Sequence, residues 1–508
     1  MIKPIGLIIL LLEQPNIGTA QAKNAQQTDT PATLCPAELD TAIKTVTNRP
    51  EFSRERWGIL IQTQSADTLY SQDAQKYFIP ASNVKLLTTA AVLQLGSQFR
   101  IRTSVYATRD GGLRVVGRGD PSLTDAQLIQ LAQQLKQRGI RQVNRLIADN
   151  KYFLGATVNP SWEWSDVQTD YGAPVNSLIL NQNAVKLTLF PQQKSQPLLV
   201  NWSDPIEAKQ WQISNETITT ESVESTAINI SRESTTPILK ITGQLNIDQA
   251  ESVSLAVVDP VAHFMRHWRR ALANQGIGES VSSSTAQNSL TNKQPLLLNE
   301  LAVVESPPLF ELLKETNQNS NNLYAEALLR VLGARLGKLT TPTVLESSPP
   351  GGILPPGKTG RLSADTTLDM GLGVVKATLT EMGVDPSGYV LVDGSGLSRH
   401  NLVTPEAIAQ TLRSMNKSPL AAIYRASLPV AGRLGTLKDR FRNTPAAGIV
   451  QAKTGTLTGV VALSGYIEPP SSEPLVFSII VNQTDQNAAT IRQAVDEIVL
   501  LLTRLRRC

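Results

Sequence analysis

The sequence lacks several features that would assign it to a specialised class. No apolar run approaches the ~20 residues that a membrane-spanning helix needs, so no stable span is expected. The basic residues are scattered and aromatic residues make up only 5%, which gives no indication of a nucleic-acid partner. We find no internal repeat of fixed period. A chain of 508 residues that is 41% hydrophobic and 18% charged is therefore expected to be globular, with two or three domains.

Three short motifs carry the strongest chemical signal. They are, in order, Ser82-Asn83-Val84-Lys85, Ser320-Asn321-Asn322 and Lys453-Thr454-Gly455. A serine hydroxyl needs an adjacent base before it can act as a nucleophile. The apolar spacing that follows Ser82 predicts a buried helix, with Ser82 at its N-terminus and Lys85 one turn later on the same face. We predict that Ser82 is the nucleophile and that Lys85 is its base.

A lysine acts as a base only when it is neutral, which requires a lowered pKa. We expect burial and a neighbouring cation, Lys453, to lower the pKa of Lys85. A Ser-His-Asp triad that uses His400 stays open as an alternative, although it would leave the lysine motifs unexplained.

The third motif lies in a segment of alternating polarity, residues 449–463, which predicts one strand. Gly455 would let a ligand backbone approach the edge of this strand. Lys453, with the hydroxyl groups of Thr454 and Thr456, can hold a substrate carboxylate. The backbone N–H groups of Ser82 and Thr456 are expected to form an oxyanion hole.

The chain also contains second copies of two of these patterns. Ser414-Met415-Asn416-Lys417 repeats the first pattern, but it lies near a predicted helix end before Ser418-Pro419. Lys358-Thr359-Gly360 repeats the third, but it lies in a Pro/Gly-rich loop, residues 348–360, and not in a strand. We interpret both copies as coincidental.

The histidines offer little further chemistry. His263 and His267 have the i, i+4 spacing of metal ligands on a helix, but no metal-ligand motif accompanies them. We interpret them as ordinary helix residues, and we expect neither a metal nor a cofactor.

The N-terminus predicts export. Lys3, an apolar run over residues 5–12 and Ala20-Gln21-Ala22 together have the features of a signal peptide, residues 1–22. The alternatives are an uncleaved anchor and a wrongly assigned start codon. We expect an exported protein, in the periplasm or on the wall side of the membrane.

After the signal peptide, a change in the sequence pattern predicts a core domain that is interrupted by an insertion. Residues 98–291 read as short alternating strands separated by Gly, Pro, Asn and Ser, and we predict one or two inserted β-rich domains there. Residues 23–97 and 292–508 are expected to form one core domain, because Ser82 and Ser320 must meet in a single site.

The three motifs together resemble those of penicillin-binding proteins and serine β-lactamases. Further segments resemble the D-alanyl-D-alanine carboxypeptidase/endopeptidase family, the class C low-molecular-mass penicillin-binding proteins of peptidase family S13. These segments are Gly117-Arg118-Gly119-Asp120-Pro121, Trp164-Ser165-Asp166, Tyr171-Gly172-Ala173-Pro174, Asn181-Gln182-Asn183 and Asp393-Gly394-Ser395-Gly396-Leu397-Ser398-Arg399. The resemblance implies an α/β (α+β) transpeptidase-like fold, in which helices flank an antiparallel sheet.

The same resemblance implies a serine DD-peptidase without a cofactor. It would cleave terminal D-Ala-D-Ala bonds, or D-Ala-diaminopimelate cross-links of peptidoglycan, through an acyl-enzyme on Ser82. Its partners would be peptidoglycan stem peptides and muropeptides, with β-lactams as covalent inhibitors. A β-lactamase, or a non-catalytic protein that binds β-lactams or peptidoglycan, are the alternatives, and the sequence does not indicate the oligomeric state.

The resemblance also implies roles for single residues. Ser320 would relay a proton toward the leaving amine, and Asn322 would orient Lys85. Asp166 and Tyr171 would bind the free amine of the substrate's side-chain residue, with assistance from Arg399.

The two cysteines lie at opposite ends of the mature chain. Family members pack their first and last helices side by side, and residues 36–44 and 487–507 look helical here. Cys35 and Cys508 therefore either form a disulfide, which an exported protein permits, or stay as two free thiols.

Overall fold

The computed structural model describes residues 33–221, 227–232, 238–280, 299–340 and 366–508. The predicted signal peptide and the Pro/Gly-rich loop with Lys358 lie outside these residues. Among the helices within them, none has the length and apolar character needed to cross a membrane.

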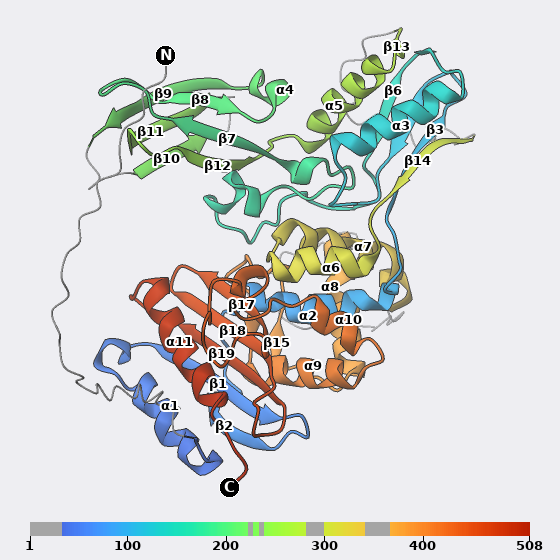
Figure 1. Cartoon of the computed structure of the whole chain (residues 1–508). Helices are drawn as coiled ribbons and strands as arrows, with labels where there is room; N and C mark the ends of the chain where they lie inside the picture. Colours follow the sequence, from blue (N-terminus) through green and yellow to red (C-terminus); the bar gives the residue numbers. More distant parts are fainter. Residues whose placement is uncertain (1–32, 222–226, 233–237, 281–298, 341–365) are drawn as a thin grey trace, which may run out of the picture.

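A five-stranded antiparallel sheet forms the centre of the core domain (Figure 1). Its order is β17-β18-β19-β1-β2, so the first and last strands of the chain pair in the middle of the sheet. The strands are β1 (Arg56–Thr63), β2 (Thr68–Gln72), β17 (Val450–Leu457), β18 (Val460–Ile467) and β19 (Leu475–Asn482). Both faces are buried, because Ile59 and Ile61 enter one apolar cluster while Leu60 enters another.

Helices cover both faces of this sheet. On one face lie the terminal helices α1 (Leu39–Thr47) and α11 (Ala488–Leu502), which share an apolar cluster with the sheet. A larger helical layer lies on the other face. A two-stranded ribbon, β15 (Tyr389–Val390) and β16 (Leu402–Val403), contributes residues to the same apolar cluster. The helices of this layer are α2 (Val84–Val92), α6 (Leu309–Gln318), α7 (Asn322–Thr340), α8 (Thr367–Glu381), α9 (Pro405–Lys417) and α10 (Ala421–Ala426). This arrangement confirms the predicted α+β core.

The prediction of one strand over residues 449–463 was wrong. The chain reverses after Leu457, and β17 and β18 form an antiparallel hairpin. Gly459 lies in the turn with φ of +72°, a left-handed conformation that glycine adopts without steric cost. Residues 450–453 alternate in polarity and residues 460–463 are all apolar, and both patterns are typical of strands, so the sequence did not reveal the reversal between them.

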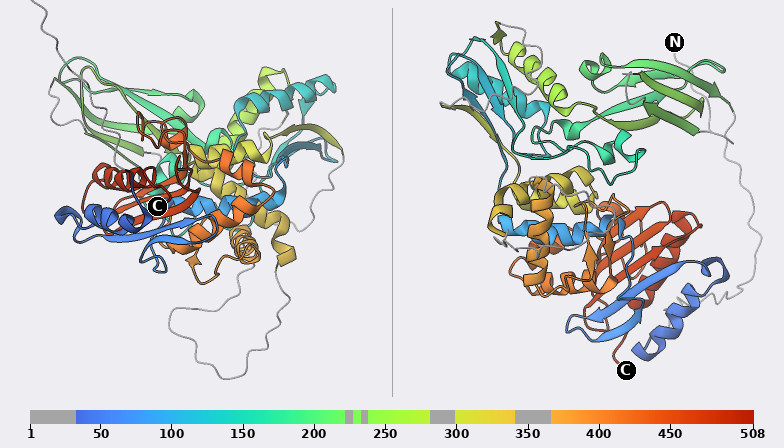
Figure 2. Two further views of the ribbon diagram at one scale, coloured as in Figure 1. Left: turned by 60° about the horizontal axis from the view of Figure 1, so that its bottom comes forward. Right: turned by 180° about the vertical axis from the view of Figure 1, so that it is seen from behind.

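The segment between the first two motifs forms two further packing units, drawn above the core in Figure 1 and from behind in Figure 2. In one, α3 and α5 pack on the sheet β14-β3-β4-β6, and in the other the sheets β12-β7-β8 and β10-β11-β9 share an apolar cluster. β14 lies beyond residue 291, yet it pairs with β3 and so brings the two ends of the insertion together.

The bounds of the inserted elements follow their order in the chain. In the first unit they are β3 (Arg102–Ala107), β4 (Leu113–Val116), α3 (Asp125–Gln137), β5 (Gln142–Val143), β6 (Leu146–Asp149), α5 (Pro260–Asn274), β13 (Gly278–Glu279) and β14 (Glu300–Glu305). In the second they are β7 (Ala184–Phe190), β8 (Leu199–Trp202), α4 (Pro205–Ala208), β9 (Gln212–Thr220), β10 (Ala227–Arg232), β11 (Ile238–Asn246) and β12 (Glu251–Ala256).

The two ends of the described chain are joined covalently and by hydrogen bonds. Cys35 and Cys508 form a disulfide with a Cα–Cα distance of 5.8 Å, which selects the disulfide over two free thiols. Next to it, the backbone N–H of Leu34 donates to the carbonyl of Arg504 (2.9 Å), and that of Arg506 donates to the carbonyl of Leu34 (3.1 Å). The disulfide thus fastens α1 to α11.

Replacing both cysteines with serine is expected to lower the free energy of unfolding by about 2–4 kcal/mol, because the cross-link restricts the unfolded chain. Thermal and denaturant unfolding of the double variant Cys35→Ser/Cys508→Ser would measure the loss. A reductant should lower the melting temperature of the wild type and leave that of the variant unchanged. Equal melting temperatures for the oxidised wild type and the variant would contradict this prediction.

Candidate active site

Ser82 and Lys85 lie together where α2 begins. Ser82 belongs to a single 3-10 turn, Ala81–Asn83, which leads directly into α2. Lys85 Nζ lies 2.9 Å from Ser82 Oγ, as the one-turn spacing predicts. The Lys85 side chain is fully buried, whereas Ser82 is partly exposed. A serine hydroxyl within reach of solvent thus contacts an amine that solvent does not reach.

Burial lowers the pKa of Lys85 to about 7, against the opposing effect of the carboxylates of Asp393 and Glu326. Burial also lowers the pKa of Lys453, and the proximity of Lys85 lowers it further. Burial, one of the two expected causes, thus lowers the pKa of Lys85, whereas Lys453 is not among the groups that shift it. A substantial fraction of Lys85 is neutral near pH 7 and able to accept the Ser82 proton.

The other two motifs meet beside this pair. Lys453 Nζ donates to Ser320 Oγ (2.8 Å) and to the carbonyl of Thr454 (2.9 Å). Ser320 connects α6 to α7 with φ of +57°, a conformation that costs a non-glycine residue energy and that often occurs at functional sites. Thr454 contacts the hydroxyl of Thr436 at 2.8 Å.

Asn322 links the lysine to the inserted segment. Its Oδ1 accepts a hydrogen bond from Lys85 Nζ (2.7 Å), and its Nδ2 donates to the carbonyl of Tyr171 (3.0 Å). Ser320, Asn322 and Tyr171 also line a cavity of about 420 Å³ that extends to Lys186 and Ser254 on β7 and β12. The inserted module therefore forms one wall of the space next to the catalytic motifs.

Two glycines allow the backbone to close around Ser82. A Cβ on Gly396, which has φ of +82°, would lie 1.9 Å from the carbonyl oxygen of Ala81. A Cβ on Gly455 would lie 2.8 Å from the carbonyl oxygen of Pro80. Gly455 is thus required by the approach of β17 to the turn that carries Ser82. The expectation that Gly455 also lets a ligand backbone approach the edge of this strand stays a prediction.

The residues expected to bind the substrate's free amine lie close together. Tyr171 and Arg399 both lie close enough to Asp166 to favour its charged carboxylate. Burial and the nearby Glu163 nevertheless raise the pKa of Asp166. Arg399 Nε pairs with Glu163 (2.8 Å), and its Nη1 donates to the carbonyl of Thr458 (3.0 Å). Tyr171 remains 45% exposed, so its ring is available to a ligand.

Sequence reasoning missed Glu326, a buried carboxylate behind the lysine. Its Oε1 accepts hydrogen bonds from the backbone N–H groups of Gly394 (2.8 Å) and Ser395 (2.9 Å), and the carbonyl of Ser395 accepts from Lys85 Nζ (2.7 Å). Glu326 lies four residues after Asn322 on α7, a spacing that places both on one helical face. That spacing was the available signal.

Asp393 has a similar supporting role. Its carboxylate accepts hydrogen bonds from the backbone N–H groups of Gly396 and Ser398, both at 2.7 Å, and from Trp162 Nε1 at 3.0 Å. It therefore holds the segment that follows it against the turn of Ser82.

The copy of the first motif at Ser414 lies away from this constellation. Ser414 Oγ donates to the carbonyl of Met382 (2.8 Å), and Lys417 ends α9 with an exposed side chain. Lys358, in the copy of the third motif, lies outside the described residues.

Comparisons with known proteins agree with this geometry. A model of the D-Ala-D-Ala carboxypeptidase 3 (S13) family matches residues 39–345 and 358–504. The chain is 32% identical to a D-alanyl-D-alanine carboxypeptidase of an Actinomadura species, over 84% of this chain and 77% of that protein. It is 29% identical to the penicillin-sensitive carboxypeptidase A of Dictyostelium discoideum, over 88% of this chain and 87% of that protein.

A solved structure shows the same fold. The crystal structure of penicillin-binding protein 4 from Haemophilus influenzae covers 91% of this chain and 98% of its own, with a TM-score of 0.73 and 23% identity.

Proposed function

The chain belongs to the D-Ala-D-Ala carboxypeptidase (S13) family, and from this premise we propose that it is a serine DD-peptidase whose nucleophile is Ser82. The contact of Ser82 Oγ with the buried Lys85 Nζ at 2.9 Å carries the assignment of the residues. The substrate is the D-Ala-D-Ala terminus of a peptidoglycan stem peptide, or a D-Ala-diaminopimelate cross-link.

In the acylation step, neutral Lys85 accepts the hydroxyl proton while Ser82 Oγ attacks the carbonyl carbon of the penultimate D-Ala. The backbone N–H groups of Ser82 and Thr456 stabilise the oxyanion. The C–N bond breaks as the leaving amine takes a proton through Ser320, which contacts Lys453. D-Ala, or the amine of the donor peptide, leaves.

In the deacylation step, water attacks the ester on Ser82 and the free peptide departs. Lys453, Thr454 and Thr456 are suited to hold the terminal carboxylate of a carboxypeptidase substrate, because the exposed Thr456 lies on the same strand as the buried amine of Lys453. The same site accepts a β-lactam, whose opened ring stays on Ser82 as an ester. The Haemophilus influenzae protein has also been solved in complex with a β-lactam.

The test is incubation of the purified mature protein with a fluorescent penicillin and, separately, with cross-linked muropeptides. We expect a long-lived adduct on Ser82, together with release of D-Ala or of monomeric muropeptides, both followed by mass spectrometry. Rapid penicillin turnover without peptide cleavage would replace the proposal with a β-lactamase. An adduct without any turnover would indicate a binding protein, and the absence of an adduct would reject Ser82 as nucleophile.

The predicted place of action is the peptidoglycan, which lies outside the cytoplasmic membrane. The signal-like residues 1–22 and the Cys35–Cys508 disulfide both support export. Fractionation of cells that express the full chain would locate the mature protein.

Replacing Asp166 with asparagine is expected to raise KM about tenfold for peptides with a free side-chain amine, because a hydrogen bond between charged groups is lost. The acylation rate by penicillin, which lacks that amine, should stay unchanged. A matched peptide whose side-chain amine is acetylated serves as the control. If Asp166→Asn changed KM equally for both peptides, Asp166 would have no part in recognising the amine.

A further inference from the structure

A cluster of two histidines and three carboxylates lies on the inserted module and contains no residue of the three sequence motifs. His263 and His267 are one turn apart on α5, with ring centroids separated by 4.5 Å. Asp204 comes from the start of α4. One nitrogen of each histidine and one carboxylate oxygen of Asp204 all lie within 4.8 Å of one another. These three residues are called the His-Asp cluster below.

A different carboxylate contacts the Nδ1 atom of each imidazole. His263 Nδ1 lies 3.1 Å from Glu207 Oε2, and His267 Nδ1 lies 2.7 Å from Asp125 Oδ1. Histidine ligands of metals are usually oriented in this way, with the nitrogen distal to the carboxylate left to bind the metal. His267 Nε2 lies 2.9 Å from Asp204 Oδ2, so two potential ligand atoms already lie next to each other.

His263 differs from His267 in the surroundings of its distal nitrogen, Nε2. Within the described residues, His263 Nε2 is buried and has no hydrogen-bond partner, and the residue is 1% exposed. A buried polar atom without a partner costs free energy and calls for an explanation. Coordination of an ion would supply the missing partner.

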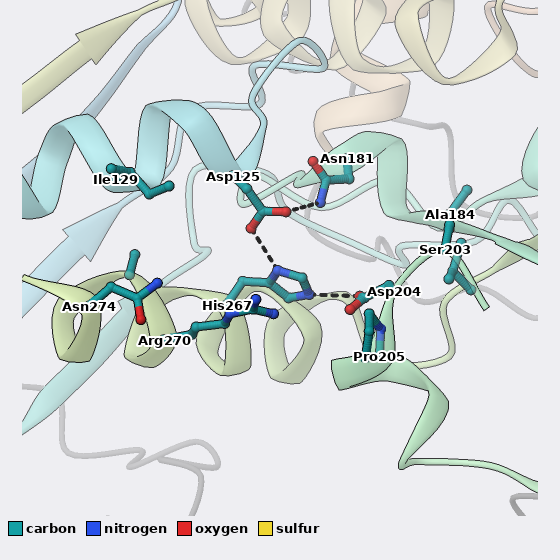
Figure 3. Close-up of a pocket in the computed structure, with 12 residues that line it drawn as sticks. Asp125, Ile129, Asn181, Ala184, Ser203, Asp204, Pro205, His267, Arg270 and Asn274 are labelled. Atoms are coloured by element: carbon teal, nitrogen blue, oxygen red, sulfur yellow. Dashed lines mark hydrogen bonds and ion pairs between the residues drawn. The ribbon is translucent and has the colours of Figure 1, made fainter. Parts of the chain in front are cut away.

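Two members of the cluster, Asp204 and His267, border a cavity. Asp125, Asp204 and His267 line a cavity of about 410 Å³. Figure 3 shows the His267 ring between the two carboxylates, with Arg270 beside it on the same helix.

We propose that His263, His267 and Asp204 bind a divalent cation of the zinc type, with water as the fourth ligand. Two imidazoles and one carboxylate are ligands that zinc accepts, and three protein ligands with an open position form a known zinc geometry. Bonds of about 2.0–2.1 Å place tetrahedral ligands about 3.4 Å apart. The ligand atoms of the cluster lie within 4.8 Å of one another, so a bound ion would have to draw them closer together to reach that spacing.

Charged side chains next to the cluster also affect how it would hold a cation. Glu207 is already neutralised by Arg266, at 2.6 Å, whereas Arg270 lines the cavity and opposes a cation.

The test uses the mature protein after treatment with a chelator, with Co²⁺ as the spectroscopic probe and Zn²⁺ titrated against a chromophoric chelator. We expect one equivalent of metal to bind and Co²⁺ to give the visible absorption of a tetrahedral site. His263→Gln and Asp204→Asn should each weaken zinc binding by about 100-fold or more. Asp204→Asn keeps a good helix cap, so the fold should survive.

Two further variants sharpen the result. The remaining histidine, His400, is exposed and supplies the matched control: His400→Gln should bind zinc like the wild type. Arg270→Gln should bind it more tightly, because a repelling charge is removed. Failure to bind one equivalent of zinc, or equal affinities of the wild type, His263→Gln and Asp204→Asn, would overturn the proposal.

Discussion

The variant Ser82→Ala is expected to lose penicillin labelling and peptide cleavage together, with a fall in rate of about 10⁶-fold, as when other serine hydrolases lose their nucleophile. Both reactions begin with attack by the same Oγ, so one substitution removes both. Gel labelling with a fluorescent penicillin and the release of D-Ala from a stem-peptide analogue would measure the two losses.

The chain supplies its own control for this experiment. Ser414 begins the second copy of the S-x-x-K pattern, and Ser414→Ala should keep both activities. The fold of Ser82→Ala should also be intact, because Lys85 keeps its contacts with Asn322 and with the carbonyl of Ser395. A folded Ser82→Ala protein that still formed a covalent penicillin adduct would show that another residue is the nucleophile.

The parts of the site that depend on local spacing could be predicted from the sequence. Ser82 and Lys85 are one helical turn apart, so helix geometry alone places them on one face, and the structure confirms their contact. The meeting of Ser320 and Lys453 with this pair depends on long-range packing. The resemblance to a known family predicted that meeting, and helix periodicity did not.

Supporting residues were harder to find because their partners are distant in sequence. Glu326 acts through the backbone of Gly394 and Ser395, and a backbone hydrogen bond leaves no pattern in the side chains of its partners. The His-Asp cluster was missed for the same reason. His263 and His267 had the right spacing, but Asp204 approaches them only because α4 packs near α5.

The limits of the insertion depend on strand pairing. The composition predicted an insertion over residues 98–291, and these boundaries stay a prediction. β14, which follows that range, pairs with β3, which begins it. Short alternating segments do not reveal which strand will be their neighbour, so the sequence could indicate β-rich material and could not place its last strand.

A base in the low-dielectric interior is the second large contributor to rate. Lys85→Met is expected to slow acylation of Ser82 by penicillin about 10⁴-fold, because methionine fills a similar volume and cannot accept a proton. Stopped-flow acylation kinetics would measure the loss. The exposed lysine of the second copy is the matched control, and Lys417→Met should acylate at the wild-type rate. If a correctly folded Lys85→Met protein acylated as fast as the wild type, Lys85 would not be the base.

The pH dependence identifies the base independently. The active form of Lys85 is neutral, so the acylation rate should rise with pH through about 7 and then level off. Glu326, whose own pKa burial raises to about 7, could give the same profile, and Glu326→Gln separates the two. The negative charge of Glu326 raises the pKa of Lys85, so its removal should move the midpoint of the profile to lower pH while the profile persists. If the dependence on pH disappeared in Glu326→Gln, the titrating group would be Glu326 and the assignment of Lys85 as base would lose its main kinetic support.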